Sequence, residues 1–366
     1  MARSHPGSLD LDNNRFLQLI VSSTVFLLKW LLRPFARGNN DILVISFNNI
    51  GDSILSLPAL TQLKRENPGT RITLLTYFDL GFLFETSGPE IKKVFVERGE
   101  FSGGGKLPTF KVINEARRVR AGVVINFSEN PQSVFTMLFS GGKRFYGIAR
   151  KAYSPAFDKF NKMRDLPHLQ DIYFDAVESY RKTNRAVEER VFPLREKRGD
   201  EIILTPFAGW DEKTWGLENM ITLSERLSKK QPVNFVVEQG RLSREVLADI
   251  SARGVRVTLL ASLVHYLPHL QNAAMLVAND TGPVHLAAWY GIPTVAIFGP
   301  TNPEFCKQPG NHHIAIHKKL HCSPSRYNYC ELDAGRSCPA RVCLTGITVD
   351  EVESAVLAHL EKFRSR

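Results

Sequence analysis

The sequence predicts an α/β protein made of two doubly wound domains behind an apolar N-terminal helix. Short apolar runs typical of buried parallel strands alternate with helix-length segments, once after Asn40 and again after Asp200. A chain of 366 residues also exceeds the ~250–300 residues of a single core. We expect an N-terminal segment over residues 1–38, a first domain over 39–195 and a second over 196–366.

The first series begins with a strand over Ile42–Ile45, followed by a polar loop over Asn48–Asp52. Ser56 and Pro58 suit the opening of a helix that ends near Asn67. The segment 143–165 is basic and gives few structure signals. Further strands are expected at Arg71–Tyr77, Val94–Val96 and Val123–Asn126, with a helix at Asp171–Arg181.

The second series repeats the alternation. Its predicted strands are 202–204, 233–237, 255–259, 275–278 and 294–298, and its predicted helices are 217–230, 242–253 and 350–362. The charged stretch Arg195–Asp200 separates the two series.

Residues 16–35 form an apolar segment with a basic end. Arg15 and Lys29 bracket 13 uncharged residues, about 20 Å of helix at ~1.5 Å per residue, which is short for a ~30 Å hydrocarbon core. Trp30 and Arg33 suit a membrane interface. We expect an interfacial helix on the cytoplasmic face. The alternatives are a helix packed on the first domain and a signal anchor.

The charge is concentrated in the first half of the chain. The formal net charge is +10, of which residues 1–195 carry +9 and residues 196–366 carry +1. A basic half favours an anionic partner such as a phosphorylated glycolipid or an acidic membrane surface. The alternative is an ordinary solvated surface. We expect no nucleic-acid binding, because no basic aromatic stripe or familiar binding module is present.

Gly51 and Asp52 are the first candidate site residues. They follow the first strand, at the sheet edge where open α/β sheets bind ligands. A glycine there allows close approach of the backbone to a ligand, and the aspartate suits a general base. The alternative role for Asp52 is a helix cap or turn residue.

A second candidate is the segment Asn279–His285, which also follows an apolar strand. Pro283 suits the first position of a helix that Asp280 or Thr281 would cap. The N–H groups of Thr281 and Gly282 would then lie at a positive helix end that binds phosphate. His285 falls in the first turn of that helix, where it would contact a bound ligand. The alternative is a plain capped turn, with His285 an ordinary histidine near the cap.

Lys213 is the third candidate, and the cysteines form a weaker fourth. Lys213 lies between Trp210 and Trp215 after a predicted strand, so it can neutralise phosphate charge or simply lie on the surface. The spacings of the last four cysteines do not match a CxxC pair. A zinc site on them is an alternative to reduced structural thiols; these four residues are Cys322, Cys330, Cys338 and Cys343.

Several enzyme classes lack their signatures in this chain. The sequence contains no GxxxxGK[ST] loop, GxGxxG fingerprint, HExxH helix or GxSxG elbow. Their absence argues against P-loop nucleotidases, most dehydrogenases, zincins and serine hydrolases.

Three segments together resemble glycosyltransferase family 9, the bacterial lipopolysaccharide heptosyltransferase-like enzymes. The segments are ILVISFNNIGDSILSLPALTQLKRENPG, PFAGWDEKTWGLENM and MLVANDTGPVHLAAWYGIPTVAIFGPTNPE. The third is the most specific, through DTGPVHLAA followed by GIPTVAIFGPT. The resemblance covers about residues 41–360 and implies a GT-B fold, in which two Rossmann-like domains face a cleft.

The resemblance also implies a reaction. Asp52 matches the aspartate proposed as general base of an inverting transfer, and Lys213 with the N–H groups of Thr281 and Gly282 would stabilise the leaving diphosphate. Asp280 would organise the loop or contact the sugar. No metal is required in this scheme. The family default is heptose from ADP-heptose, transferred to a lipid-linked lipopolysaccharide core acceptor held by the first domain.

Two stretches depart from the family pattern. Ser46–Asn49 lacks the charged residues usual before Gly-Asp, and Val236–Gly240 lacks the usual glycine-rich turn. The alternatives are therefore another nucleotide sugar, a soluble acceptor, or a non-catalytic relative that binds a nucleotide sugar. We expect a peripheral protein on the cytoplasmic face of the inner membrane.

Overall fold

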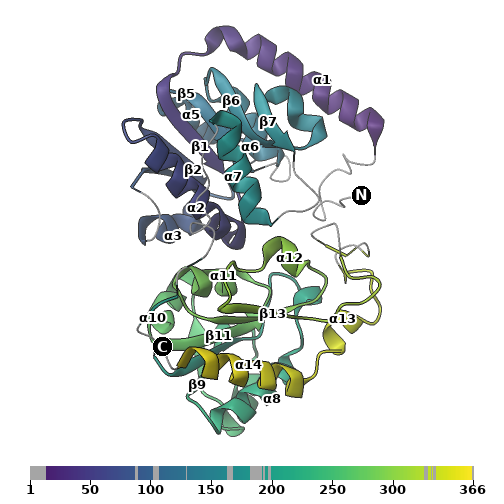
Figure 1. Cartoon of the computed structure of the whole chain (residues 1–366). Coiled ribbons are helices and arrows are strands. Elements are labelled where there is room, and N and C mark those ends of the chain that lie inside the picture. Colours follow the sequence, from purple (N-terminus) through teal and green to yellow (C-terminus); the bar gives the residue numbers. More distant parts are fainter. Residues whose placement is uncertain are drawn as a thin grey trace. The chain divides into compact units, whose positions relative to one another are not determined.

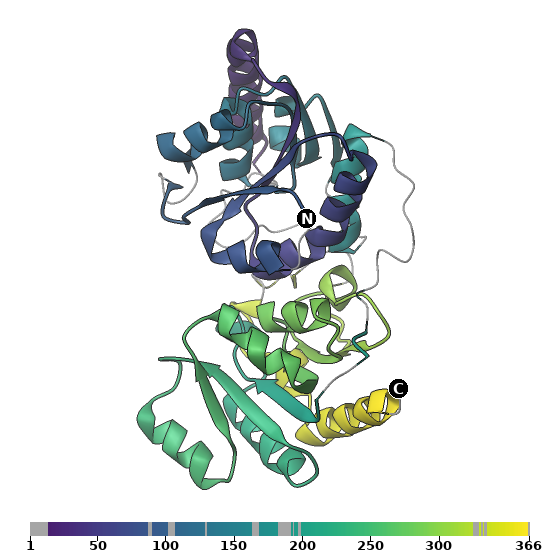
Figure 2. The same ribbon diagram turned by 90° about the vertical axis from the view of Figure 1, so that its left-hand side faces the viewer.

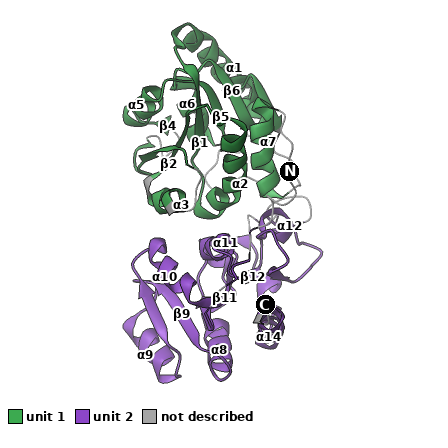
Figure 3. Cartoon of the chain, turned by 60° about the vertical axis from the view of Figure 1, so that its left-hand side comes forward, with its two compact units in different colours: residues 1–186 green, residues 187–366 purple. Residues whose placement is uncertain are grey.

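The computed structural model divides the chain into two compact units, residues 1–186 and 187–366 (Figure 3). Each unit is described by itself. Part of the predicted N-terminal segment, residues 1–13, lies outside the described residues. The structure describes residues 14–86, 90–101, 107–128, 130–162, 168–181, 192, 194–196, 199–324, 329–330, 332 and 335–364.

Unit 1 is built on a six-stranded sheet in which every described pairing is parallel. The strand order is β3-β2-β1-β5-β6-β7. Helices lie on both faces of the sheet (Figures 1 and 2), so the central strands are buried and read as continuous apolar runs. The strands are β1 (Asn39–Ser46), β2 (Ile72–Tyr77), β3 (Lys92–Val96), β5 (Ala121–Asn126), β6 (Arg144–Ala149) and β7 (Lys159–Lys162), with the short β4 (Leu107–Pro108) outside the sheet.

The helices of unit 1 connect these strands. They are α1 (Arg15–Leu32), α2 (Ile50–Glu66), α3 (Gly81–Thr86), α5 (Phe110–Arg118), α6 (Pro131–Phe139) and α7 (Leu169–Tyr180), with 3-10 turns η1 (Arg33–Phe35), η2 (Phe78–Leu80) and η3 (Lys151–Ala156).

Helix α2 begins earlier than the sequence predicts. Ser56 and Pro58 do not open it; Pro58 lies inside a helix that begins at Ile50. A proline inside a helix costs about 3 kcal/mol, but residues 53–60 of α2 are all buried, and this burial outweighs the cost. The predicted polar loop is therefore shorter, and Asp52 lies in the first helical turn.

Unit 2 repeats the architecture, with the order β10-β9-β8-β11-β12-β13 and parallel pairings throughout its described sheet. Its strands are β8 (Glu201–Thr205), β9 (Val233–Glu238), β10 (Val257–Leu260), β11 (Ala273–Asn279), β12 (Thr294–Phe298) and β13 (His313–His317). Its helices are α8 (Leu217–Ser228), α9 (Arg244–Ala252), α10 (Tyr266–Gln271), α11 (Gly282–Trp289), α12 (Pro303–Cys306), α13 (Val342–Thr345) and α14 (Val349–Arg364), with 3-10 turns η5 (Asp211–Lys213) and η6 (Leu263–His265).

In both sheets the order in which strands are added along the chain reverses at the first strand of the unit. In unit 1 the chain builds outward from β1 to β3 and then returns to place β5 on the other side of β1. In unit 2, β8 and β11 stand in the same relation. Ligands of doubly wound sheets bind at the carboxyl ends of the strands at such a reversal. The loops after β1 and β5, and those after β8 and β11, are therefore the places to look for a site.

The two central strand pairs begin with a close backbone approach that requires glycine. The β1–β5 register shifts between Asn39 and Ile42, and a Cβ on Gly122 would lie 1.9 Å from the Asn39 carbonyl oxygen. In unit 2 the β11–β8 register shifts similarly, and a Cβ on Gly199 would lie 1.9 Å from the Asn272 carbonyl oxygen. Glycine at these positions lets the strands start in register.

We predict that Gly122→Ala destabilises unit 1, because the added methyl group collides with backbone that cannot move without breaking the strand pairing. Overpacking of this kind costs about 1–3 kcal/mol, which lowers the melting temperature by roughly 2–12 °C in a unit of this size. The control is Gly69→Ala, where a Cβ meets nothing within 4 Å. Equal melting temperatures for the two variants, measured by calorimetry, would contradict the prediction.

Candidate functional site

Asp52 lies at the reversal point of unit 1. It occupies the first turn of α2, directly after β1, and both Gly51 and Asp52 are half-buried. A carboxylate in the first turn of a helix is stabilised by the positive end of the helix dipole. The residue therefore remains partly accessible at the sheet edge where ligands bind, and the arrangement agrees with either a general base or a helix-terminus role.

A polar network holds the loop before Asp52. Asn48 accepts a hydrogen bond from the Ser128 hydroxyl at 2.8 Å, and its amide group lies 3.3 Å from the Tyr173 hydroxyl. The Phe47 N–H donates to the Ser128 hydroxyl at 2.9 Å, and the Asn130 amide donates to the Phe47 carbonyl at 2.9 Å. Loops after β1 and β5 are thereby tied together at the reversal point.

Sequence reasoning missed this network. The sequence predicted a polar loop at Asn48 and showed the absence of charged residues in Ser46–Asn49, but no role was assigned to Ser128 or Asn130. The available signal was their position, since they follow the predicted strand that ends at Asn126. In a parallel sheet that strand can lie beside the first one, which would have brought the two polar loops together.

Lys213 and Asp280 form a buried ion pair at the reversal point of unit 2. Lys213 lies in the η5 turn after β8 and Asp280 directly follows β11. The Lys213 ammonium contacts Asp280 Oδ2, and the two side chains are only 11% and 4% exposed. The Thr301 hydroxyl donates to the same carboxylate oxygen at 2.8 Å. The two sequence candidates are thus brought together, although 66 residues separate them in the chain.

The surroundings of Asp280 favour its charged form. Burial alone raises the pKa of this carboxyl, but the Lys213 ammonium and His285, together with the hydrogen bonds from Lys213 and Thr301, lower that pKa below its usual value. The carboxylate therefore stays ionised and holds the Lys213 ammonium in a fixed position. The sequence allows either Asp280 or Thr281 as the cap of the following helix. The residue before the helix is Thr281, so Asp280 is not the cap.

Aromatic and amide groups fix the loop around Lys213. The Lys213 ammonium lies 4.5 Å from the centre of the Trp210 ring, a favourable cation–π contact. The Trp215 N–H donates to the Asn279 amide oxygen at 2.9 Å, and the Asn279 amide donates to the Pro206 carbonyl at 2.6 Å. Asn279 therefore joins the loops after β8 and β11.

The start of α11 offers backbone N–H groups beside this pair. Thr281 is the residue before the helix and makes no capping bond through its side chain, Gly282 begins the helix, and Pro283 takes the second rather than the first position. Within the described part of the chain, the N–H groups of Thr281 and Gly282 have no hydrogen-bond acceptor. A helix end of this kind, half-exposed here, is suited to phosphate oxygens.

His285 is buried behind this helix end. Its side chain is 6% exposed, and its Nε2 lies 3.9 Å from Asp280 Oδ1. Its Nδ1 lies 3.3 Å from the Gln308 amide nitrogen. His285 therefore lies close to the Asp280 carboxylate and helps to lower the pKa of that carboxyl.

The described residues do not assemble a metal site. Burial, the largest cause, raises the pKa of the Cys330 and Cys343 thiols. Among the residues the structure describes, no group of three or more His, Cys, Asp or Glu is arranged to hold a metal ion.

Comparison with protein families gives a match to the model of glycosyltransferase family 9 (heptosyltransferase) over residues 153–334. The matched stretch includes Lys213, Asp280 and His285, whereas Asp52 lies before it.

Curated relatives match over most of the chain. The lipooligosaccharide heptosyltransferase 2 of Campylobacter jejuni is 24% identical, over 77% of this chain and 88% of its own length. The lipopolysaccharide heptosyltransferase 1 of Pseudomonas aeruginosa is 25% identical, over 79% of this chain and 87% of its own length.

Solved structures share the fold. A glycosyltransferase of family 9 from Veillonella parvula superposes with a TM-score of 0.73 at 19% identity, covering 88% of this chain and 98% of the other. The ADP-heptose lipopolysaccharide heptosyltransferase II of Escherichia coli gives a TM-score of 0.66 at 18% identity, covering 88% and 99%. With two parallel six-stranded sheets, the predicted GT-B class is confirmed. The chain belongs to glycosyltransferase family 9 and is a heptosyltransferase-like glycosyltransferase.

Proposed function

We propose that the protein transfers a heptose from ADP-heptose to an anionic, lipid-linked lipopolysaccharide core acceptor. The observation that carries the proposal is the buried Lys213–Asp280 pair beside the open N–H groups of Thr281 and Gly282. Curated relatives in this family are lipopolysaccharide or lipooligosaccharide heptosyltransferases. One E. coli relative was solved with ADP and again with ADP-2-deoxy-2-fluoro heptose, which supports an ADP-sugar as the donor.

Unit 2 binds the diphosphate of the donor in this proposal. An ammonium group has three N–H donors, and the contact with Asp280 uses one of them, so two remain for phosphate oxygens. The N–H groups of Thr281 and Gly282 supply two more donors at a positive helix end. These groups stabilise the negative charge that grows on ADP as it leaves, without requiring a metal ion.

Unit 1 binds the acceptor and supplies the base. The Asp52 carboxylate takes the proton of the acceptor hydroxyl as that oxygen attacks the anomeric carbon of the heptose. The new bond joins the acceptor oxygen to this carbon, and the bond from the carbon to the phosphate oxygen breaks with its electron pair leaving on ADP. A single displacement inverts the anomeric carbon.

The proposed lipid-linked acceptor implies that the protein works at a membrane, because such an acceptor lies at one. Among the residues that the structure describes, one helix, residues 15–35, is long and apolar enough by length and composition to cross a membrane. We propose that the protein is peripheral on the cytoplasmic face of the inner membrane, with contact through residues 16–35.

The donor is tested by thermal shift of the full chain with ADP, UDP, GDP and CMP, each with and without Mg²⁺. We predict selective stabilisation by ADP. A ligand at 100 times its dissociation constant adds about 2.7 kcal/mol to the free energy of unfolding. The proposal also predicts the same response with and without Mg²⁺. Selective stabilisation by UDP or GDP would contradict the ADP donor, and no response to any of the four nucleotides in a folded sample would contradict a nucleotide-sugar donor altogether.

We predict that Asp52→Asn lowers kcat by about 10²–10⁴-fold, because removal of a positioned base has this effect. Binding of ADP, which unit 2 provides, should not change. The matched control is Asp79→Asn, which removes a carboxylate of unit 1 that pairs with Arg98 on the surface. Turnover of Asp52→Asn within a few fold of that of Asp79→Asn would exclude Asp52 as the base.

Lys213→Met is expected to reverse the pH dependence that Asp280 gives to stability. In the unmodified protein the pKa of Asp280 is lowered, so its contribution is present at neutral pH and is lost as pH falls below about 4. Without Lys213, burial raises this pKa, and the free energy of unfolding should fall as pH rises from about 4 to 7. Breaking a buried pair costs about 3–5 kcal/mol.

The double variant Lys213→Met/Asp280→Asn is the matched control. It removes both charges, so its stability should vary little between pH 4 and pH 7, as measured by urea unfolding. Both variants should bind ADP more weakly, because the phosphate loses its cation in each. If Lys213→Met unfolds with the same pH dependence as the unmodified protein, the pair does not hold Asp280 ionised.

A further inference from the structure

Helix α1 exposes its apolar face. Seven large apolar side chains of α1 are between 46% and 73% exposed. They recur at intervals of three and four residues and therefore lie on one side of the helix. These residues, which we call the α1 stripe, are Phe16, Leu19, Ile20, Phe26, Leu27, Trp30 and Leu31.

The opposite side of α1 is attached to unit 1. Val25 is fully buried, and the Ser22 hydroxyl donates to the Ala152 carbonyl at 3.0 Å. The Lys29 ammonium lies 2.8 Å from Asp158 Oδ1. The helix thus lies lengthwise along the outside of unit 1 (Figures 1 and 2). While it is attached in this way, it cannot cross a bilayer, but it can lie in the plane of one.

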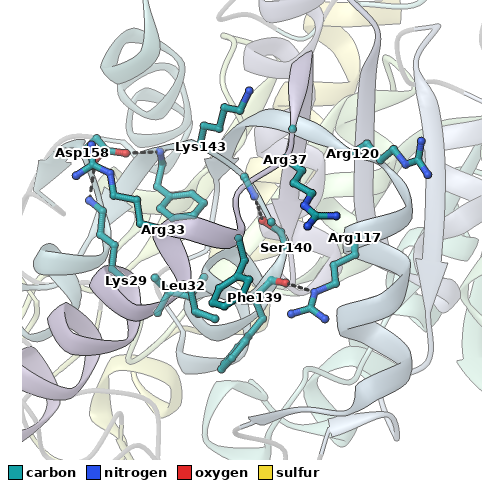
Figure 4. Close-up of a pocket in the computed structure, with 16 residues that line it drawn as sticks. Lys29, Leu32, Arg33, Arg37, Arg117, Arg120, Phe139, Ser140, Lys143 and Asp158 are labelled. Atoms are coloured by element: carbon teal, nitrogen blue, oxygen red, sulfur yellow. Dashed lines mark hydrogen bonds and ion pairs between the residues drawn. The ribbon is translucent and has the colours of Figure 1, made fainter.

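A basic pocket lies at the C-terminal end of α1. Its volume is about 850 Å³. Basic side chains reach it from α1, from η1 and the turn before β1, from α5 and the turn after it, and from the turn before β6 (Figure 4). Its basic residues are Lys29, Arg33, Arg37, Arg117, Arg120 and Lys143.

Most of this positive charge is not neutralised. Asp158 is the one carboxylate among the described residues that line the pocket. Its two oxygens are already used, Oδ1 by Lys29 and Oδ2 by the Phe145 N–H at 2.8 Å. The other side chains make no ion pair with any described residue; they are Arg33, Arg37, Arg117, Arg120 and Lys143. These side chains are exposed to solvent, and several exposed cations grouped around one pocket attract an anionic occupant.

The pocket is separate from the site around Asp52. Arg37 precedes β1, Arg120 precedes β5 and Lys143 precedes β6, so all three lie at the amino ends of their strands. Asp52 follows the carboxyl end of β1. The eight residues of β1 span roughly 26 Å at ~3.3 Å per residue. An acceptor hydroxyl at Asp52 and an anion in the pocket therefore lie at opposite ends of the strands, the carboxyl ends and the amino ends respectively.

We propose that the α1 stripe and the basic pocket form one membrane-docking surface that binds a phosphate headgroup of an anionic phospholipid. The stripe enters the boundary between headgroups and acyl chains, where Trp30 is favoured. Next to it, the basic residues that line the pocket, among them Arg33, Arg37, Arg120 and Lys143, attract the headgroup phosphate. The proposal rests on the membrane contact in the proposed function, but not on the donor or on the transfer reaction.

The test is cosedimentation of the full chain with vesicles of phosphatidylcholine alone or mixed with phosphatidylglycerol. The pocket variant is Arg33→Gln/Arg37→Gln/Arg120→Gln/Lys143→Gln. We expect its binding to the mixed vesicles to be roughly 100- to 1,000-fold weaker, since each cation near an anionic surface contributes several fold. Binding to the mixed vesicles by the unmodified protein should also fall steeply with added salt.

The matched control removes four exposed cations from unit 2, as Lys229→Gln/Arg244→Gln/Lys319→Gln/Arg336→Gln. It has the same net charge as the pocket variant and should still bind the mixed vesicles. A third variant, Phe26→Ser/Leu27→Ser/Trp30→Ser, should bind both kinds of vesicle more weakly. Circular dichroism and thermal unfolding identify any variant that fails to fold, and single substitutions of the same residues then replace it.

Three results would overturn the proposal. The pocket variant could bind mixed vesicles as well as the unmodified protein does, or the control could lose as much binding as the pocket variant. Binding that resists both high salt and alkaline extraction would indicate a helix that spans the bilayer. Transfer to a water-soluble acceptor should be equal in the pocket variant and the unmodified protein. If the unmodified protein binds the mixed vesicles but transfers no sugar, the docking surface is supported while the proposed function fails.

Discussion

The reversal of strand order in an all-parallel sheet is the constraint on which the rest of this protein depends. Parallel strands need crossover connections, and right-handed crossovers place helices on both faces of the sheet. When the chain returns to the far side of its first strand, two neighbouring crossovers leave in opposite directions, and the loops between them separate. In unit 1 this position lies between β1 and β5, and in unit 2 between β8 and β11. The positions of the candidate residues in both units depend on this reversal.

The two units use the same position for different chemistry. In unit 1 the loops at the reversal point are joined by hydrogen bonds between neutral groups such as Asn48 and Ser128, and the half-buried Asp52 lies in the first turn of α2 that follows. In unit 2 it has a buried ion pair and an open helix end. A general base needs a carboxylate that the substrate hydroxyl can reach, whereas a leaving diphosphate needs fixed cations and N–H donors. The difference agrees with the proposed division into acceptor and donor binding.

Short-range sequence patterns predicted the central strands and the loops that follow them. The apolar runs at Ile42–Ile45 and 294–298 correspond to β1 and β12, and the loops that follow the strands contain Lys213 and Asp280 as expected. Strand β6 and the edge strands β7 and β13 were not predicted, because their half-polar sequences, such as His313–His317, lack the continuous apolar run of a buried strand. The start of α2 was misjudged because Pro58 is a common first-turn residue, and only tertiary burial explains its place inside the helix.

Long-range contacts could not be predicted in this way. Nothing within a short window of sequence indicates that Asp280 binds Lys213, or that Ser128 binds Asn48, because each pairing depends on strand order. The same holds for the basic pocket, whose cations come from α1, η1 and α5 and from the turns before three different strands. The sequence shows that α1 is rich in apolar residues, but it does not show which of them face outward. That depends on which side of the helix packs on unit 1, and this side contains Val25 and Ser22.

The most direct test of the account is the product of the reaction itself. The full chain is incubated with ADP-heptose and a deacylated lipopolysaccharide core acceptor, and the product is analysed by mass spectrometry and by NMR of the new anomeric centre. The account predicts the addition of one heptose for each ADP released, with the anomeric configuration inverted relative to the donor. Retention of configuration would contradict a single displacement assisted by Asp52. Absence of transfer, in a protein that binds ADP, would contradict the proposed acceptor.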